Sequence, residues 1–241
     1  MLDPRIYGIK EKTKNIKRII SIVSGKGGVG KSTIASTMSI LLAKKRYKTG
    51  LLDLDFHGPT CHMVLGIDKF QYEEEKGILP YEVEGIRFAS IYPFVEEKAV
   101  PLRGYDISNA IIEFLAIINW GDLDYLIIDM PPGMGDPFLD VVRYLPKAEY
   151  IVITTGSILS ISTVARLVDF LVKQNYRTIG LIENMQTNIM RGVEKIVEKF
   201  KIRLLGSISF DPYLENALGN IDMITKTKFA EDLDKIIRSI I

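Results

Sequence analysis

Short apolar runs alternate along this chain with longer segments in which apolar residues recur at helical spacing. Two of the runs, 125–128 and 150–153, are continuously apolar, as is typical of central parallel strands covered on both faces. The alternation predicts an α/β fold in which a mostly parallel twisted sheet carries helices on both faces. The expected strands are 18–24, 48–54, 86–92, 124–130, 149–155, 178–184 and 203–208, and the expected helices are 32–46, 107–119, 161–174 and 189–200.

The alternation is interrupted between residues 67 and 106, where glycines, prolines and an acidic run at 73–75 are concentrated. We predict that this stretch is a peripheral insertion within a single domain that spans residues 1–241. Residues 1–17 are expected to form a solvated N-terminal arm. The last segment, 226–241, has one apolar helical face and a polar face whose charges nearly balance, which favours a helix packed on the core over a membrane anchor.

Composition narrows the class of protein further. A chain of 241 residues with 47% hydrophobic composition can build a large core, but it has no apolar run of about 18 residues that would cross a bilayer. The formal net charge of +1 gives no general attraction to nucleic acid. With no early apolar stretch that resembles a signal peptide, we expect a cytoplasmic protein without nucleic-acid or membrane partners.

A glycine-rich turn follows the first expected strand and precedes the first expected helix. Residues 25–32 read Gly-Lys-Gly-Gly-Val-Gly-Lys-Ser, a complete match to the phosphate-binding pattern Gly-x-x-x-x-Gly-Lys-Ser. The backbone amides of such a loop and the following helix N-terminus point at phosphate oxygens. We expect Lys31 to contact the β- and γ-phosphates and the Ser32 hydroxyl to ligate Mg²⁺. The predicted nucleotide-binding residues of this loop are Gly25, Lys26, Gly27, Gly28, Val29, Gly30, Lys31, Ser32 and Thr33.

Carboxylates follow two further expected strands. Asp129 ends a central strand, where ligands bind in such sheets, and is the natural Walker B carboxylate for Mg²⁺. Strand alternation places Asp53 and Asp55 on the same side of the chain, so one can position the attacking water while the other supports the metal. The N–H of Gly133, which lies in the turn after Asp129, is expected to contact the γ-phosphate. Together these carboxylates indicate hydrolysis as well as binding.

The second lysine of the loop, Lys26, lies too early in the turn to reach the γ-phosphate of its own subunit while Lys31 occupies that place. We therefore expect it to contact a nucleotide bound by a second subunit. The motif resembles the deviant Walker motif of the P-loop ATPases that include the ParA and MinD partition proteins, the nitrogenase iron protein and the Mrp/ApbC carriers. In that branch the corresponding lysine acts across a nucleotide-sandwich dimer. The resemblance implies a homodimer in which Lys26 and Lys31 are both catalytic.

The same resemblance assigns roles to other residues. It implies that Asp55 positions the water and leaves Asp53 to support the metal, with Ser32 and Asp129 as the other metal-site residues. Asn184 and Pro212 lie where this branch contacts adenine, and no guanine-selecting Asn-Lys-x-Asp or Thr-Lys-x-Asp motif follows a strand. The expected ligands are therefore ATP and Mg²⁺.

Within this branch the chain is most similar to the Mrp/ApbC family, over residues 18 to 220. Residues 123–136, which include Asp-Met-Pro-Pro-Gly-Met-Gly-Asp, resemble that family's signature, and the Glu-Asn-Met triplet at 183–185 also matches it. The resemblance implies iron–sulfur cluster assembly or delivery to apoprotein clients through an ATP-controlled dimer. The family's Cys-x-x-Cys pair is missing, however, because residues 186–194 contain no cysteine.

The missing pair leaves cluster binding open, since the chain has one cysteine, Cys61. We expect this thiol to be a buried small hydrophobe, the alternative being a redox or metal ligand helped by His57 or His62. Two other functions remain open: a MinD- or ParA-like positioning ATPase, and a scaffold or regulatory ATPase that has lost cluster binding.

Overall fold

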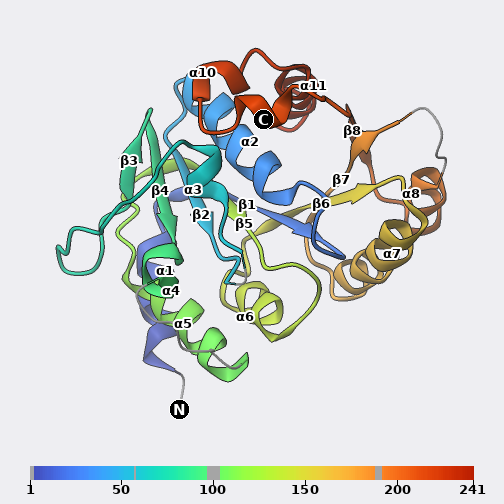
Figure 1. Cartoon of the computed structure of the whole chain (residues 1–241). Helices are drawn as coiled ribbons and strands as arrows, with labels where there is room; N and C mark the ends of the chain where they lie inside the picture. The colour runs from blue at the N-terminus through green and yellow to red at the C-terminus, as the bar shows by residue number, and fades with distance from the viewer. Residues whose placement is uncertain (1–2, 57, 97–103, 188–191) are drawn as a thin grey trace.

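The computed structural model describes residues 3–56, 58–96, 104–187 and 192–241. Within them, eight strands form one sheet in the order β3-β4-β2-β5-β1-β6-β7-β8 (Figure 1). Neighbouring strands are parallel except for β3, which runs antiparallel to β4 at one edge. The strands are β1 (Ile16–Ser24), β2 (Thr49–Asp53), β3 (Tyr81–Val83), β4 (Ile86–Ser90), β5 (Leu123–Asp129), β6 (Glu149–Thr155), β7 (Thr178–Gln186) and β8 (Leu204–Ser209).

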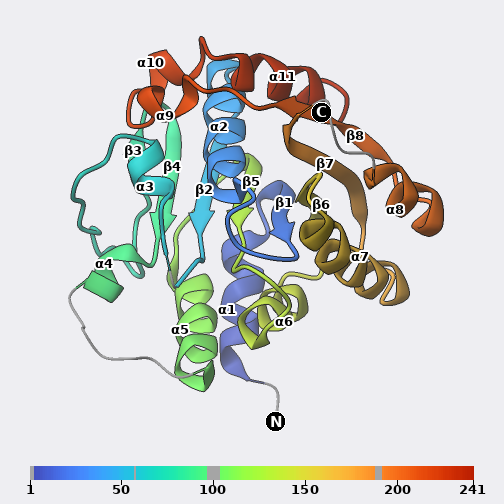
Figure 2. The same ribbon diagram turned by 45° about the vertical axis from the view of Figure 1, so that its right-hand side comes forward.

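Alternate side chains of each central strand enter two separate cores, one on each face of the sheet. In β1, for example, Ile20 and Ile22 belong to one core, and Ile19 and Val23 belong to the other. The mostly parallel sheet with helices on both faces is therefore confirmed, as Figure 2 shows. All seven predicted strands are present, and the sequence pattern missed β3 because it is short and partly solvent-exposed.

The first core is covered by α2 (Lys31–Lys44), α3 (Cys61–Val64) and three elements near the C-terminus, α9 (Leu214–Ala217), α10 (Ile221–Ile224) and α11 (Lys228–Ile237). The helix α11 buries Phe229, Leu233 and Ile237, so the expectation that the last segment packs on the core is confirmed. Among the described helices, none combines the length and apolarity that spanning a bilayer requires.

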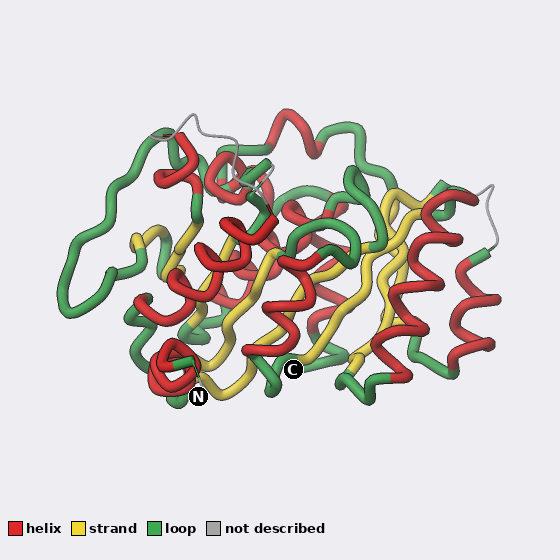
Figure 3. Tube along the Cα trace, turned by 90° about the horizontal axis from the view of Figure 1, so that it is seen from below, coloured by secondary structure: helices red, strands yellow, loops and turns green. Residues whose placement is uncertain are grey.

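The second core is covered by helices that follow other strands, and Figure 3 looks onto this layer. Residues 4–13, expected within a solvated arm, instead form a helix that packs against α5 and buries Ile9. Asp3 caps this helix and Pro4 begins it, which are helix start signals that the sequence analysis did not use. The helices of this layer are α1 (Pro4–Thr13), α5 (Gly104–Ile117), α6 (Asp136–Tyr144), α7 (Ile158–Lys173) and α8 (Val193–Phe200), and α4 (Tyr92–Glu96) lies in the connection before α5.

Candidate functional site

The glycine turn joins the buried end of β1 to the start of α2, at the carboxyl edge of the sheet. Gly28 and Gly30 have φ angles of 75° and 82°, in the left-handed region that favours glycine, and α2 begins immediately afterwards at Lys31. The turn encloses a cavity of about 250 Å³. Its lining contains eight of the nine predicted loop residues and five residues from elsewhere in the chain. The lining residues are Ser24, Lys26, Gly27, Gly28, Val29, Gly30, Lys31, Ser32, Thr33, Asp55, Gly58, Thr60 and Pro132.

Lys31 lies between two carboxylates at the base of this cavity. Its ammonium is 2.5 Å from Asp129 Oδ1 and 3.9 Å from Asp55 Oδ2, and only 6% of the side chain is exposed. Burial alone would lower the pKa of Lys31, but the charge of Asp129 and the hydrogen bond to it raise the pKa above its usual value. The lysine is therefore charged and already placed at the helix N-terminus where phosphates bind.

Asp53 and Asp129 are paired by the register of β2 and β5 and are both fully buried. Asp53 accepts hydrogen bonds from the backbone N–H groups of Asp55 and Cys61, each at 3.1 Å. Burial, together with the charge of Asp129, raises the pKa of Asp53 to about 7. The two buried carboxylates and the Ser32 hydroxyl, which lies in the first turn of α2, are hard oxygen donors of the kind that Mg²⁺ prefers, so the residues present fit this ion.

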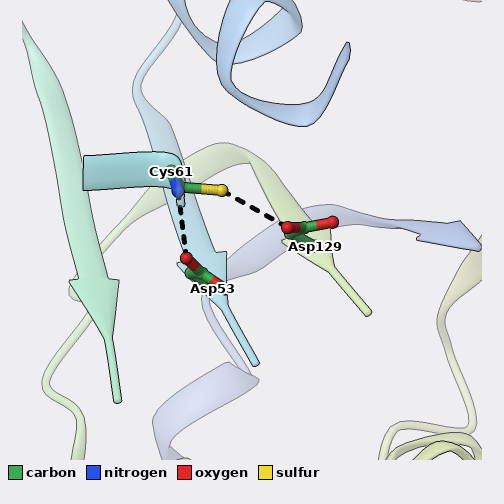
Figure 4. Close-up of side chains that lie close together, drawn as sticks. All are labelled: Asp53, Cys61 and Asp129. Atoms are coloured by element: carbon green, nitrogen blue, oxygen red, sulfur yellow. Dashed lines mark hydrogen bonds between the residues drawn. The ribbon is translucent and has the colours of Figure 1, made fainter. Parts of the chain in front are cut away.

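Cys61 lies against the same carboxylates, as Figure 4 shows. Its Sγ is 3.5 Å from Asp129 Oδ2, and one ligand atom from each of Asp53, Cys61 and Asp129 lies within 4.8 Å of the others. Burial, and then the charges of the two aspartates, raise the pKa of the thiol well above its usual value. The thiol is therefore protonated and donates to Asp129. Of the two histidines named as its possible helpers, His62 stacks on Tyr92 and His57 lies outside the described residues.

Lys26 is half-buried at the mouth of the cavity, and its carbonyl accepts a hydrogen bond from Ser24 Oγ. Its ammonium forms no ion pair within the part of the chain that the structure describes, in contrast to Lys31. The loop thus has one lysine paired with carboxylates inside the cavity and a second, Lys26, that has no carboxylate partner among the described residues.

A second cavity, of about 180 Å³, adjoins the first and shares Gly30 and Thr33 with it. Its lining includes the two predicted base contacts, Asn184 and Pro212, together with Phe210. The cavity at the glycine turn is suited to the phosphate chain of a nucleotide, and the adjoining cavity is suited to its base. A larger cavity, of about 550 Å³, lies beside Arg87 and Trp120, near the amino ends of β4 and β5 and away from the glycine turn. The volume of a cavity therefore does not identify the nucleotide site in this protein.

Asn184 also makes a contact that the sequence analysis did not anticipate. Its side chain is 2% exposed, and Nδ2 donates a 2.8 Å hydrogen bond to the Val29 carbonyl of the glycine turn. A side-chain carbon at Gly30 would come within 2.3 Å of the same nitrogen. The end of β7 is therefore joined to the glycine turn by a direct hydrogen bond. No signal in the sequence links these residues, because the contact depends on how β7 sits beside the loop.

Gly133 makes a backbone contact that the sequence did not predict. Its N–H donates a 3.0 Å hydrogen bond to the Ser24 carbonyl, at the start of the glycine turn, so it is not directed at the phosphate cavity. Pro131 and Pro132 lie between the end of β5 and Gly133, and Pro132 lines the phosphate cavity. The expected contact of the Gly133 N–H with a γ-phosphate stays a prediction.

A glycine turn closed over a buried lysine, at a helix N-terminus and beside two strand-end carboxylates, defines a P-loop nucleotide-binding protein. The family model for ParA, described as "NUBPL iron-transfer P-loop NTPase", matches residues 15–241. The chain belongs to this family of iron-transfer P-loop NTPases.

Individual relatives agree with this assignment. The iron-sulfur cluster carrier protein of Saccharolobus solfataricus is 34% identical, over 95% of this chain and 86% of the relative. A nucleotide-binding protein of Archaeoglobus fulgidus, solved in complex with ADP, is 29% identical with a TM-score of 0.77, covering 92% of this chain and 93% of that chain. The septum site-determining protein MinD of Pyrococcus horikoshii, solved with Mg-ADP, is 22% identical with a TM-score of 0.69, covering 92% and 95%, and shows the shared fold alone.

Proposed function

We propose that this protein is a cytoplasmic, Mg²⁺-dependent ATPase that acts in iron–sulfur cluster assembly or delivery through an ATP-controlled homodimer. The proposal rests on the position of Lys31, whose charged ammonium lies between Asp129 and Asp55 in the cavity of about 250 Å³ at the glycine turn. Membership in an iron-transfer NTPase family supports the biological role. The ADP and Mg-ADP complexes of the two structural neighbours support the choice of nucleotide and ion.

In this proposal, Lys31 exchanges one anionic partner for another when ATP enters. Its ammonium leaves Asp129 for the β- and γ-phosphates, while the backbone amides of the turn contact the phosphate oxygens. The base occupies the adjoining cavity beside Asn184 and Pro212. Ser32 and Asp129, supported by Asp53, would hold Mg²⁺, which neutralises phosphate charge when bound. Asp55, at the rim of the same cavity, then orients the attacking water.

Lys26 is assigned to the nucleotide of the second subunit. Its position at the cavity mouth and its lack of an ion pair among the described residues support this role. A positive charge brought to the γ-phosphate stabilises the transition state of phosphoryl transfer. Closing the dimer would therefore switch on hydrolysis, and loss of the γ-phosphate would weaken the contact that keeps it closed.

The chain's own residues do not fit a bridging cluster held in the family's usual way. A two-fold dimer contains two copies of Cys61, both fully buried against Asp129, where a bridging cluster wants about four thiolates. This observation favours a second candidate, a scaffold ATPase whose apoprotein partner supplies the cluster ligands. Anaerobic reconstitution with iron and sulfide separates the two: a coloured product that passes its cluster to an apoprotein supports a carrier, and a colourless ATPase supports the scaffold.

The proposal as a whole is tested by phosphate release and by sedimentation with and without ATP. We expect Mg²⁺-dependent hydrolysis and a dimer that forms with ATP and not with ADP. Binding of the ATP form to DNA or to anionic vesicles would favour the positioning-ATPase alternative instead. A chain that bound no nucleotide would contradict the proposed function directly.

Asn184 offers a test of how the site is built. We expect Asn184→Ala to weaken ATP, GTP and tripolyphosphate alike by on the order of tenfold, because the lost hydrogen bond holds the loop that binds phosphate in all three, and to weaken ATP further through loss of the base contact. Competition against a fluorescent nucleotide measures the three affinities. A loss confined to ATP would mean that Asn184 is solely a base contact. The exposed Asn216→Ala, on the short α9, is the matched control and should change none of them.

A further inference from the structure

Three buried side chains from three different elements meet at the carboxyl edge of the sheet. Asp53 ends β2, Asp129 ends β5 and Cys61 begins the short helix α3, as Figure 4 shows. All three are fully buried, and one ligand atom from each lies within 4.8 Å of the others. The proposed function uses the two aspartates for Mg²⁺ and gives the thiol no role.

The separations within this cluster match those of a tetrahedral metal site. With metal–sulfur bonds of about 2.3 Å and metal–oxygen bonds of about 2.0 Å, a sulfur and an oxygen on neighbouring corners are about 3.5 Å apart. Cys61 Sγ and Asp129 Oδ2 are 3.5 Å apart. An oxygen of Asp53 completes the set within 4.8 Å, so a small movement of that side chain brings it to coordination distance.

The hydrogen bonds already present leave these atoms able to bind a cation. Lys31 contacts Asp129 through Oδ1, so Oδ2, which faces the thiol, is not used by the lysine. Each oxygen of Asp53 accepts one backbone N–H, from Asp55 or from Cys61, and a carboxylate oxygen has two lone pairs. The thiol gives up its proton when it coordinates a metal.

The buried charges are also unbalanced. When both are ionised, Asp53 and Asp129 have two negative charges, and the one buried ammonium that faces them is that of Lys31, among the described residues. A buried charge without a counterion is unfavourable. A divalent cation between the two carboxylates supplies the missing positive charge and also compensates the thiolate.

A buried hydroxyl beside the sulfur indicates independently that a ligand belongs here. Ser36 lies in α2 and is fully buried, and its Oγ has no hydrogen-bond partner among the described residues. Buried polar groups are rarely left in this state. Burial contributes most to the raised pKa of Cys61, whereas the Ser36 hydroxyl lowers that pKa, so the hydroxyl lies on the side of the sulfur. A metal-bound thiolate would accept the hydrogen bond that this hydroxyl lacks.

The donor atoms select the class of ion. Mg²⁺ prefers oxygen ligands, whereas a thiolate favours softer ions. We propose that Asp53, Cys61 and Asp129 bind a thiophilic divalent cation, of the class of Zn²⁺, Fe²⁺ and Co²⁺, in the nucleotide-free protein. The fourth corner is open to water, as in catalytic zinc sites, and the thiol proton passes to solvent. Thr60, which precedes Cys61, lines the phosphate cavity, so the ion enters from there.

This site goes beyond the proposed function. It shares two aspartates with the Mg²⁺ position, but its occupation needs neither ATP nor a second subunit. Because the thiol is its distinguishing ligand, a spectrum that reports metal–sulfur bonding tests it directly.

The test adds Co²⁺, whose absorption reports its ligands, to the nucleotide-free full chain. We expect a near-ultraviolet charge-transfer band from thiolate to cobalt and the strong visible bands of a tetrahedral ion. Cys61 is the sole cysteine, so the charge-transfer band identifies it without any variant. Zn²⁺ should remove both sets of bands by displacing Co²⁺, and Mg²⁺ at the same concentration should not.

Cys61→Ser is expected to remove the charge-transfer band and to weaken Zn²⁺ binding by on the order of 100-fold. Competition with a chromophoric chelator measures the Zn²⁺ affinity. The serine hydroxyl can still donate to Asp129, so this variant should fold. His62→Gln changes the next residue of α3, which stacks on Tyr92, and is the matched control that should keep the band.

Three results would overturn the site. They are a parent chain that binds no Co²⁺, Co²⁺ bound without the charge-transfer band, and Zn²⁺ affinity of Cys61→Ser within about threefold of the parent. The spectra are recorded without nucleotide, and ATP binding is measured on the metal-free chain. Failure of the proposed function and failure of this site are therefore read from separate measurements.

Discussion

Lys31→Ala is expected to weaken ATP binding by at least about 100-fold, because the charge-assisted hydrogen bonds to two phosphates are lost together. The same change should lower the stability of the nucleotide-free protein by on the order of 3 kcal/mol, since Asp129 and Asp53 then stay buried without their cation. Equilibrium binding of a fluorescent ATP analogue and urea unfolding measure the two effects.

The control for this change is Lys44→Ala at the far end of the same helix. Lys44 also pairs with an aspartate, Asp222, at 2.8 Å, but both side chains are largely exposed. An exposed pair contributes little, so this variant should bind ATP normally. ATP affinity of Lys31→Ala within about threefold of the parent would show that phosphates do not occupy the cavity around Lys31.

Lys26→Ala is expected to leave ATP binding nearly unchanged and to slow hydrolysis by about 100- to 1,000-fold, as for loss of a charge that contacts the transition state. Steady-state phosphate release at saturating ATP measures the rate. Lys173→Ala, an exposed lysine paired within α7, is the matched control and should hydrolyse ATP like the parent.

Mixing two inactive variants shows whether Lys26 acts on the partner's nucleotide. In a heterodimer of Lys26→Ala with Asp55→Asn, the Lys26→Ala subunit keeps Asp55 and receives Lys26 from its partner. An equal mixture should therefore recover about one quarter of the parent rate, because half of the dimers are mixed and each has one complete site. No recovery in a mixture that forms dimers would mean that Lys26 acts within its own subunit.

The sheet was predictable because its central strands are buried on both faces and so read as continuous apolar runs. The same reasoning fails at the periphery: β3 has three residues and pairs on one side, and α1 buries a single isoleucine, Ile9, on α5. Short elements of this kind depend on the surface they meet more than on their own pattern.

The site likewise contains residues that the sequence predicted and contacts that it did not. The glycine turn, Lys31 and the strand-end aspartates could be predicted, because one continuous motif and the ends of parallel strands specify them. The hydrogen bond from Asn184 to Val29 joins residues 155 positions apart, and Cys61 meets Asp129 across 68. Contacts of this kind follow from the packed fold, and spacing along the chain does not reveal them.

The buried thiol beneath the loop has a practical consequence. Alkylating reagents are electrophiles that the thiolate attacks, and Cys61, the sole cysteine of the chain, is protonated and buried in the folded protein. A maleimide or iodoacetamide adduct on Cys61 therefore requires that the fold around Asp53 and Asp129 has opened. The rate of Cys61 alkylation therefore measures how often this region opens, and no engineered cysteine is required.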